Sequence, residues 1–178
     1  MKGIIFTEFL AMIENEVGLI ELEAGIEEAN LPNGGAYTAV GTYDHHELFS
    51  LIMVFSKRLN IPANELVRRF GKAAFGRFAE LYGNFFSHAN NAFDMLISIE
   101  SYIHPEVRKL YPDAQVPHFK STLIDKNTLE LIYESPRAMH DLADGLIEGC
   151  FEHYKESFTM KKELLTEQGN QVKYIINK

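Results

Sequence analysis

The amino-acid sequence predicts an α+β domain, in which a helical N-terminal part packs on a C-terminal part made of an antiparallel sheet and a helix. Three observations support this prediction. Apolar residues recur at helical spacing through the first two thirds of the chain of 178 residues. The last third contains two pairs of strand-like segments, each pair around a turn, with a helical segment between the pairs. Helices followed by such strands are typical of an antiparallel sheet with helices on one side.

Five helical segments are expected in the first part of the chain. They lie around Ile4–Ile13, over Leu19–Ala29, after Asp44, from Pro62 to Leu81, and over Ala89–Ile103. Asp44 is placed to cap the third segment, with Glu47 three residues later as in a capping box. Pro62 suits the first turn of the fourth segment. Pro105 indicates a boundary or a restart after the fifth, because proline lacks the backbone N–H that a continuing helix needs.

The C-terminal part alternates strand and turn signals. Strands are expected over Lys120–Ile124, Thr128–Tyr133, Ser157–Leu164 and Gln171–Ile176, and a helix over Ala138–Tyr154. The turns of the two hairpins fall at Asp125–Asn127 and Gln168–Asn170, which are rich in Asp, Asn and Gly. The sequence contains no internal repeat and no low-complexity linker, so a single domain covering residues 1–178 is expected.

Composition excludes several classes of function. The net charge of −8 argues against nucleic acid and against an anionic membrane surface as partners. No apolar run approaches the length that spans a bilayer, so no membrane insertion is expected. Cys150 is the only cysteine, which excludes an intrachain disulfide and a thiolate zinc cluster and fits a cytoplasmic location. The 13 Phe and 8 Tyr could enclose a flat apolar ligand.

A short polar pattern gives the most specific information about a ligand. Tyr133, Ser135 and Arg137 alternate, and alternate side chains of an extended segment point to one face. A phenol, a hydroxyl and a guanidinium on one face suit a ligand with two carboxylates, because Arg binds a carboxylate through two hydrogen bonds. Haem is a dicarboxylate whose iron also takes an imidazole, and His104 lies upstream.

Two simpler interpretations remain open at this point. His104 could be a packed or solvated histidine at a helix end, because seven histidines compete for the role of ligand. The Tyr-Ser-Arg pattern could be a strand that leads through a Ser cap into a helix with a surface Arg.

The order of motifs along the whole chain resembles that of the H-NOX family, the haem nitric oxide/oxygen binding domain. The shared features are the start Met1-Lys2-Gly3 with Ile5, then His104, Pro117, the Tyr-Ser-Arg pattern and Gly145–Gly149. The resemblance implies the H-NOX fold, with haem between a distal helical part at about residues 1–60 and a proximal part at about 61–178.

The resemblance also implies a role for each matching residue. His104 would be the proximal ligand of a ferrous haem b, and Tyr133, Ser135 and Arg137 would hold its propionates. Pro117 and Ile5 would press the macrocycle out of plane, and Phe78 and Leu146 would form walls of the distal pocket. No cysteine follows Cys150, so the zinc site of some relatives is not expected.

The distal residues determine which gas binds. Family members that hold oxygen carry a distal tyrosine where this chain has Leu142, and the supporting positions are Phe9 and Ala74. None of these can donate a side-chain hydrogen bond, which bound oxygen needs more than nitric oxide does. The resemblance therefore implies a nitric oxide sensor that excludes oxygen. His140 or Tyr154 would contradict this if either turned into the pocket.

The mechanism implied by the resemblance is a switch. Nitric oxide would break the bond between His104 and iron, the haem would relax towards planarity, and a separate histidine kinase or cyclic-di-GMP enzyme would respond. The chain itself would not be an enzyme. The alternatives are a haem enzyme of peroxidase type, which needs a distal acid–base group, and an apolar-ligand binding module without haem.

Overall fold

The computed structural model describes residues 1–178 and confirms the predicted α+β class. Its helices are α1 (Gly3–Val17), α2 (Leu19–Ala29), α3 (His45–Leu59), α4 (Ala63–Leu81), α5 (Gly83–Phe86), α6 (Ala92–Ile97), the π-helix η1 (Ile99–Ile103), α7 (His104–Leu110) and α8 (His140–His153). Its strands are β1 (His118–Asp125), β2 (Thr128–Glu134), β3 (Thr159–Leu164) and β4 (Gln171–Asn177). All neighbouring strands are antiparallel, in the order β1-β2-β4-β3.

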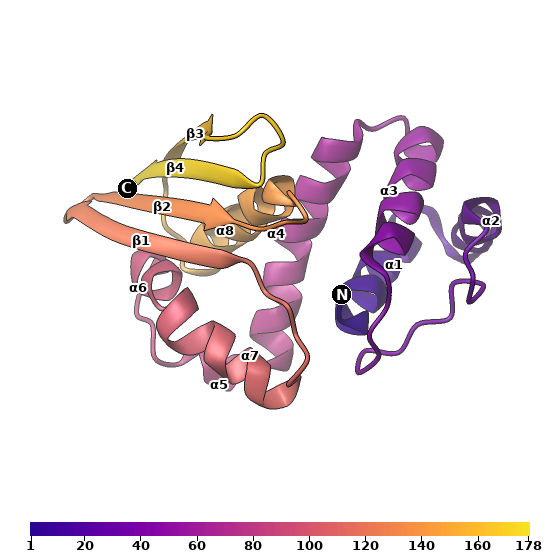
Figure 1. The fold of residues 1–178 in the computed structure, drawn as a ribbon, viewed down its shortest axis with the longest axis horizontal. Helices are drawn as coiled ribbons and strands as arrows, with labels where there is room; N and C mark the ends of the chain where they lie inside the picture. Colours follow the sequence, from indigo (N-terminus) through magenta and orange to yellow (C-terminus); the bar gives the residue numbers. More distant parts are fainter.

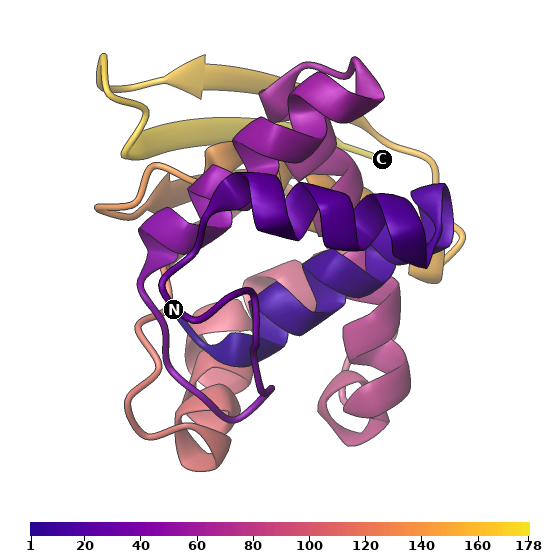
Figure 2. The same cartoon turned by 90° about the vertical axis from the view of Figure 1, so that its right-hand side faces the viewer.

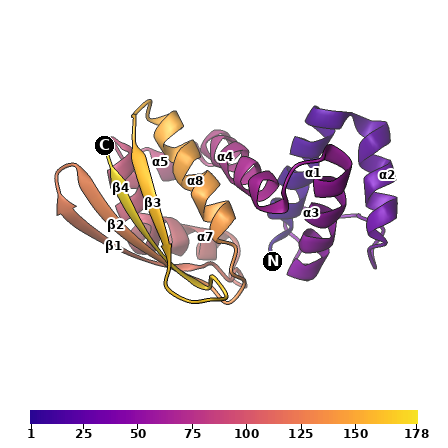
Figure 3. The ribbon, with the colours of Figure 1, turned by 90° about the horizontal axis from the view of Figure 1, so that it is seen from above.

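The elements lie in successive layers. Seen from above, the sheet is followed by α8, then by α4, and then by α1, α3 and α2 (Figure 3). Figure 1 shows the sheet and the N-terminal helices at opposite ends of the molecule, with α4 between them. Figure 2 views the molecule from the side of the N-terminal helices, with the C-terminal strands behind them. None of the helices combines the length and the apolar character needed to cross a membrane.

Two hydrophobic cores support these layers. The N-terminal core contains Phe6, Phe9 and Phe55, which are almost completely buried between α1 and α3. The C-terminal core joins the inward side chains of β2 and β4 to α6 and α8. Helix α4 belongs to both cores, because Phe70 packs in the first and Phe75 in the second. That the parts at about 1–60 and 61–178 move as separate bodies stays a prediction.

Helices α4 and α8 cross at a contact made of glycine. A Cβ atom added at Gly145 would lie 1.9 Å from the carbonyl oxygen of Arg68, and one added at Gly71 would lie 2.3 Å from that of Leu142. At Gly149 it would lie 2.8 Å from the carbonyl oxygen of Lys72. The two backbones therefore approach more closely than any side chain would allow. This approach is possible because all three positions are glycine, which has no Cβ atom.

The predicted start of α3 is confirmed, but its capping box is not. The carboxylate of Asp44 accepts a hydrogen bond from the backbone N–H of His46 at 3.0 Å. The side chain of Glu47 accepts instead from the hydroxyl of Tyr37 at 2.8 Å. The loop before α3 packs back onto the helix, and this brings Tyr37 to the carboxylate that a capping box would have used.

The segment before His104 is a π-helix, which the sequence pattern did not predict. The backbone N–H of Ile103 reaches the carbonyl of Ser98, and that of His104 reaches the carbonyl of Ile99. Both hydrogen bonds span five residues and so widen the turn. Pro105 then lies in the first turn of α7, but the expected boundary or restart is wrong, because the helical backbone continues from η1 into α7 and only the hydrogen-bond spacing changes there. Short π segments inside helices are frequent at functional sites.

Candidate functional site

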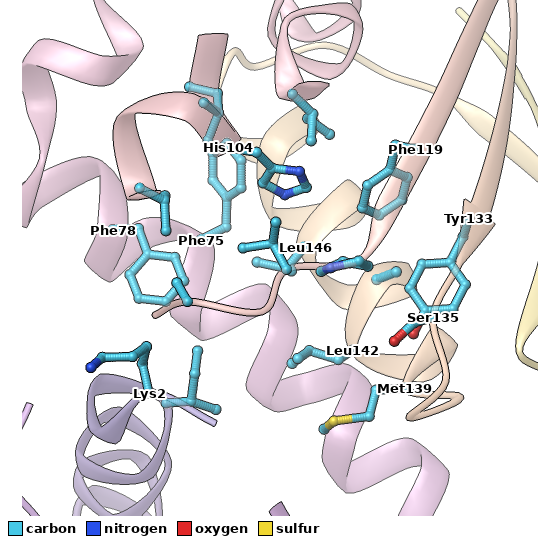
Figure 4. A pocket seen from close by; sticks show the side chains of 18 of the residues that line it. Lys2, Phe75, Phe78, His104, Phe119, Tyr133, Ser135, Met139, Leu142 and Leu146 are labelled. Carbon is cyan, nitrogen blue, oxygen red and sulfur yellow. The ribbon is translucent and has the colours of Figure 1, made fainter. Parts of the chain in front are cut away.

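A cavity of about 320 Å³ lies between the N-terminus, α4, the η1–α7 segment, the start of the sheet and α8 (Figure 4). Hydrophobic residues account for 25 of the 31 residues that line it. Its size is within the range of small-molecule sites, which are mainly apolar with a few well-placed polar groups. The cavity therefore suits a ligand that is largely apolar and polar at a restricted edge.

His104, the first residue of α7, points into this cavity (Figure 4). Its side chain is buried, and its Nδ1 atom lies 2.8 Å from Oε1 of Glu100. Burial lowers the pKa of His104, and the neighbouring Glu100 carboxylate offsets this only in part. A neutral imidazole beside a carboxylate donates from Nδ1, which leaves the lone pair of Nε2 available to a metal.

Glu100 holds its position through several donors. Its Oε1 atom also accepts the backbone N–H of Phe119 at 2.9 Å, and its Oε2 atom lies 3.2 Å from Nδ1 of His118. Burial would raise the pKa of Glu100, but the hydrogen bonds from Phe119 and His104 outweigh it and hold the pKa below its ordinary value. Glu100 is therefore a carboxylate that orients the His104 ring, as such partners do for metal-binding histidines.

Hydroxyl and guanidinium groups form a polar edge of the cavity. Tyr133 and Ser135 are buried, and their oxygen atoms lie close together (Figure 4). The Ser135 hydroxyl accepts the backbone N–H of Arg137 at 3.3 Å. The guanidinium of Arg137 donates to the carbonyl oxygen and to Oε1 of Gln115, at 2.8 and 2.6 Å. Two nitrogen atoms of the Arg137 guanidinium thus donate to two oxygen atoms, and an arginine can bind a carboxylate in the same paired way.

All nine residues predicted for the ligand site line the same cavity. They are Ile5, Phe78, His104, Pro117, Tyr133, Ser135, Arg137, Leu142 and Leu146. Leu142 and Leu146 project from α8 across the cavity from His104 (Figure 4). Their individual roles stay predictions.

Two residues are expected to support the distal side of the cavity, and that role stays a prediction. Phe9 and Ala74 do not line the cavity but pack in the N-terminal core, where the ring of Phe9 lies 5.3 Å from that of Phe70. Both belong to the N-terminal core, against which the cavity-lining residues Leu142 and Leu146 also pack. Neither His140 nor Tyr154 lines the cavity.

Several lining residues were not predicted from the sequence. Lys2 lies at the cavity, and its ammonium donates to Asp113 at 3.0 Å and to Thr42 at 2.8 Å. The hydroxyls of Tyr82 and Tyr111 lie 2.9 Å apart in the cavity wall. Gln115, Phe119 and Met139 are further examples. Lys2 belongs to the Met1-Lys2-Gly3 start, but the sequence contexts of the others carry no motif, and only the fold brings them to the cavity.

The donor set fits a haem. A neutral imidazole faces an apolar cavity, and donors for carboxylate oxygens lie at its edge. These are the groups that an iron porphyrin with two carboxylates requires: one axial nitrogen ligand, apolar walls for the ring and charged or hydroxyl donors for the carboxylates.

Comparisons with known proteins agree with this geometry. The model of a protein family described as haem-NO-binding matches residues 2–162. An unliganded Fe(II) H-NOX protein from K. algicida is 38% identical, with a TM-score of 0.93 over 99% of this chain and 96% of that chain. An H-NOX protein from S. oneidensis in the Fe(II)NO state is 28% identical, with a TM-score of 0.93 over 99% and 98%. The H-NOX from Shewanella woodyi in the Fe(II)CO state is 37% identical, with a TM-score of 0.87 over 100% and 94%.

Proposed function

Because this chain belongs to the haem-NO-binding family, also called H-NOX, whose members are haem-binding gas sensor domains, we propose that it is a nitric oxide sensor that excludes oxygen. The observation that carries the proposal is the cavity in which the buried imidazole of His104 faces apolar side chains. The sensor acts in the cytoplasm and has no catalytic activity of its own.

His104 would hold the iron of a ferrous haem b through Nε2, and Tyr133, Ser135 and Arg137 would hold its carboxylates. A haem held there would supply an iron that can bind a diatomic gas. Arg137 must turn its guanidinium from Gln115 or share it with a propionate. Pro117 and Ile5 line the cavity, and their rigid or branched side chains would press on the ring.

Exclusion of oxygen follows from the residues across the cavity from His104. Leu142, Leu146 and Phe78 offer no hydrogen-bond donor, and bound oxygen depends on such a donor more than nitric oxide does. The hydroxyls of Tyr82 and Tyr111 also lie in the wall, 2.9 Å apart, and one of them donates to the other. Exclusion of oxygen requires that the second proton of this pair does not reach the bound gas. The ammonium of Lys2 is likewise engaged with Asp113 and Thr42.

The signal would begin when His104 leaves the iron. Its imidazole is carried by the first residue of α7, so its release frees that helix from the ligand. Helix α4 joins both cores, and a change at the cavity therefore reaches the N-terminal helices. A separate histidine kinase or cyclic-di-GMP enzyme would bind the altered surface. The ligand can shift this equilibrium only by its different affinity for the two states.

An absorption spectrum of the purified, haem-supplemented protein tests the proposal. The reduced protein is exposed separately to air and to nitric oxide. We expect no oxygen complex in air, and with nitric oxide a blue shift of the haem band that marks loss of the His104 ligand. A stable oxygen complex would show that the cavity wall supplies a donor after all. Turnover with peroxide would favour a haem enzyme, and a protein without a haem band would be an apolar-ligand module.

A further inference from the structure

The carboxylate of Glu100 contacts Nδ1 of His104, and Nε2 is the ring nitrogen that would hold the iron. We propose that Glu100 sets the strength of the bond between His104 and iron, and with it the ease with which His104 is released. This inference rests on the proposed function, because it concerns the same ligand. It assigns to Glu100 the role of a positioning residue that acts through His104.

The geometry holds the carboxylate in place. Glu100 precedes His104 by four residues, and the distance from Oε1 to Nδ1 is 2.8 Å. The backbone N–H of Phe119 donates to the same oxygen at 2.9 Å, and the Nδ1 atom of His118 lies 3.2 Å from the other oxygen. Partners on two different elements, α7 and β1, therefore fix this side chain. It cannot turn away from His104 without giving up the Phe119 hydrogen bond.

The π-helix has a part in this arrangement. Its wider turn carries Glu100 as its second residue, and the first residue after it is His104. The side chains at these positions lie on the same side of the segment, so one faces the cavity and the other contacts it at Nδ1. Glu100 is only partly exposed, with 28% of its side chain accessible. The pair is therefore shielded from the solvent that would weaken its interaction.

The charge of Glu100 affects His104 electronically. A hydrogen bond from Nδ1–H to an anion leaves more electron density on the ring, and this makes Nε2 a stronger donor to a metal. The interaction is stronger than one with a neutral acceptor, because the acceptor carries a charge. Glu100 would thus oppose the release of His104. Residues in this position commonly change metal affinity or activity by about 10- to 100-fold when they are replaced.

The test compares Glu100→Gln with the unmodified, haem-loaded protein. Glutamine keeps the size of the side chain and an oxygen that can accept from His104 and Phe119, but it removes the charge. Glu106→Gln is the matched control, because Glu106 lies on α7 two residues after His104 and its side-chain partner is Lys109. The readouts are the iron–histidine stretching band in the resonance Raman spectrum, the reduction potential, and the fraction of protein that loses His104 at limiting nitric oxide.

In Glu100→Gln we expect the stretching band to move to lower frequency and the reduction potential to become more positive. The equilibrium for release of His104 should shift by about 10-fold or more towards the released state. Glu106→Gln should match the unmodified protein in all three readouts. A merely structural role for Glu100 would leave the band unchanged, because the hydrogen bonds are retained.

The result that would overturn the inference is a Glu100→Gln protein with full haem content and an unchanged stretching band. Different results would contradict the proposed function. If the unmodified protein formed a stable oxygen complex while Glu100→Gln still lowered the band, the gas selectivity would be wrong and the role of Glu100 would stand. If the unmodified protein had no iron–histidine band, both would be wrong.

Discussion

Replacing Gly145 with alanine tests whether the close crossing of α4 and α8 supports the fold. A Cβ atom at this position would lie 1.9 Å from the carbonyl oxygen of Arg68 and 2.7 Å from the backbone nitrogen of Lys72. Both atoms belong to the α4 backbone and cannot rotate away. To restore an ordinary contact of 3.4 Å, the helices must separate by about 1.5 Å at a position where both cores meet.

The expected cost follows from two opposing effects. Forcing extra volume into a packed interior costs about 1–3 kcal/mol, and contact with a rigid backbone places this case near the upper value. Alanine in a helix regains about 1 kcal/mol relative to glycine. The net loss is therefore about 2 kcal/mol, which corresponds to a decrease in Tm of about 4–8 °C for a domain of this size.

Gly76 provides the control. It lies on the exposed side of α4, and a Cβ atom there would meet nothing within 4 Å. Gly76→Ala should therefore raise Tm by about 2–4 °C through helix propensity alone. Both variants are measured by thermal unfolding at equal haem content, because a bound ligand also stabilises the folded state. A Gly145→Ala protein as stable as the parent would refute the reasoning, since the helices would then have room to separate freely.

Three further predictions concern the cavity. Leu142→Tyr should introduce a donor and allow a stable oxygen complex, which an absorption spectrum in air would reveal. Leu142→Phe is the control, and an identical response of the two variants would contradict the role of the hydroxyl. Pro117→Ala should flatten the haem, and out-of-plane Raman bands as intense as those of the parent would argue against this role. Arg137→Ala should release haem to apomyoglobin faster, because a charged hydrogen bond contributes about 1.5–3 kcal/mol; an unchanged release rate would exclude a propionate contact.

The sequence predicts the fold well where side-chain spacing alone determines an element. The apolar positions of α3 and α4 and the two hairpins carry this local signal, and the structure places the elements within a few residues of their expected bounds. β1 begins at His118, two residues before the predicted start. Such differences at the ends of elements are common, because terminal residues are held by fewer hydrogen bonds than those inside.

The sequence is less informative where tertiary contacts decide the position of a residue. Phe9 was expected at the distal pocket, but an apolar residue on α1 can face either the cavity or the N-terminal core, and spacing alone does not distinguish them. Lys2 and Glu100 carry charges, which in a sequence normally indicate solvent. Their partners, Asp113 for Lys2 and the Phe119 amide for Glu100, are distant along the chain.

The π-helix before His104 has a consequence for insertions and deletions in this chain. A π turn has one residue more than the α-helical turn that it replaces. Deleting one residue from Ile99–Ile103 would allow a regular α-helix to run from α6 into α7. After this deletion His104 would keep nearly its present direction relative to α6, because the π turn holds its extra residue within a single turn. If all the present residues were wound as a regular α-helix instead, His104 would rotate relative to α6 by about 100°, out of the cavity. The π hydrogen bonding of this turn therefore aligns the histidine, and a chain with every ligand-site residue intact could still lose its metal ligand if one more residue were inserted into the turn.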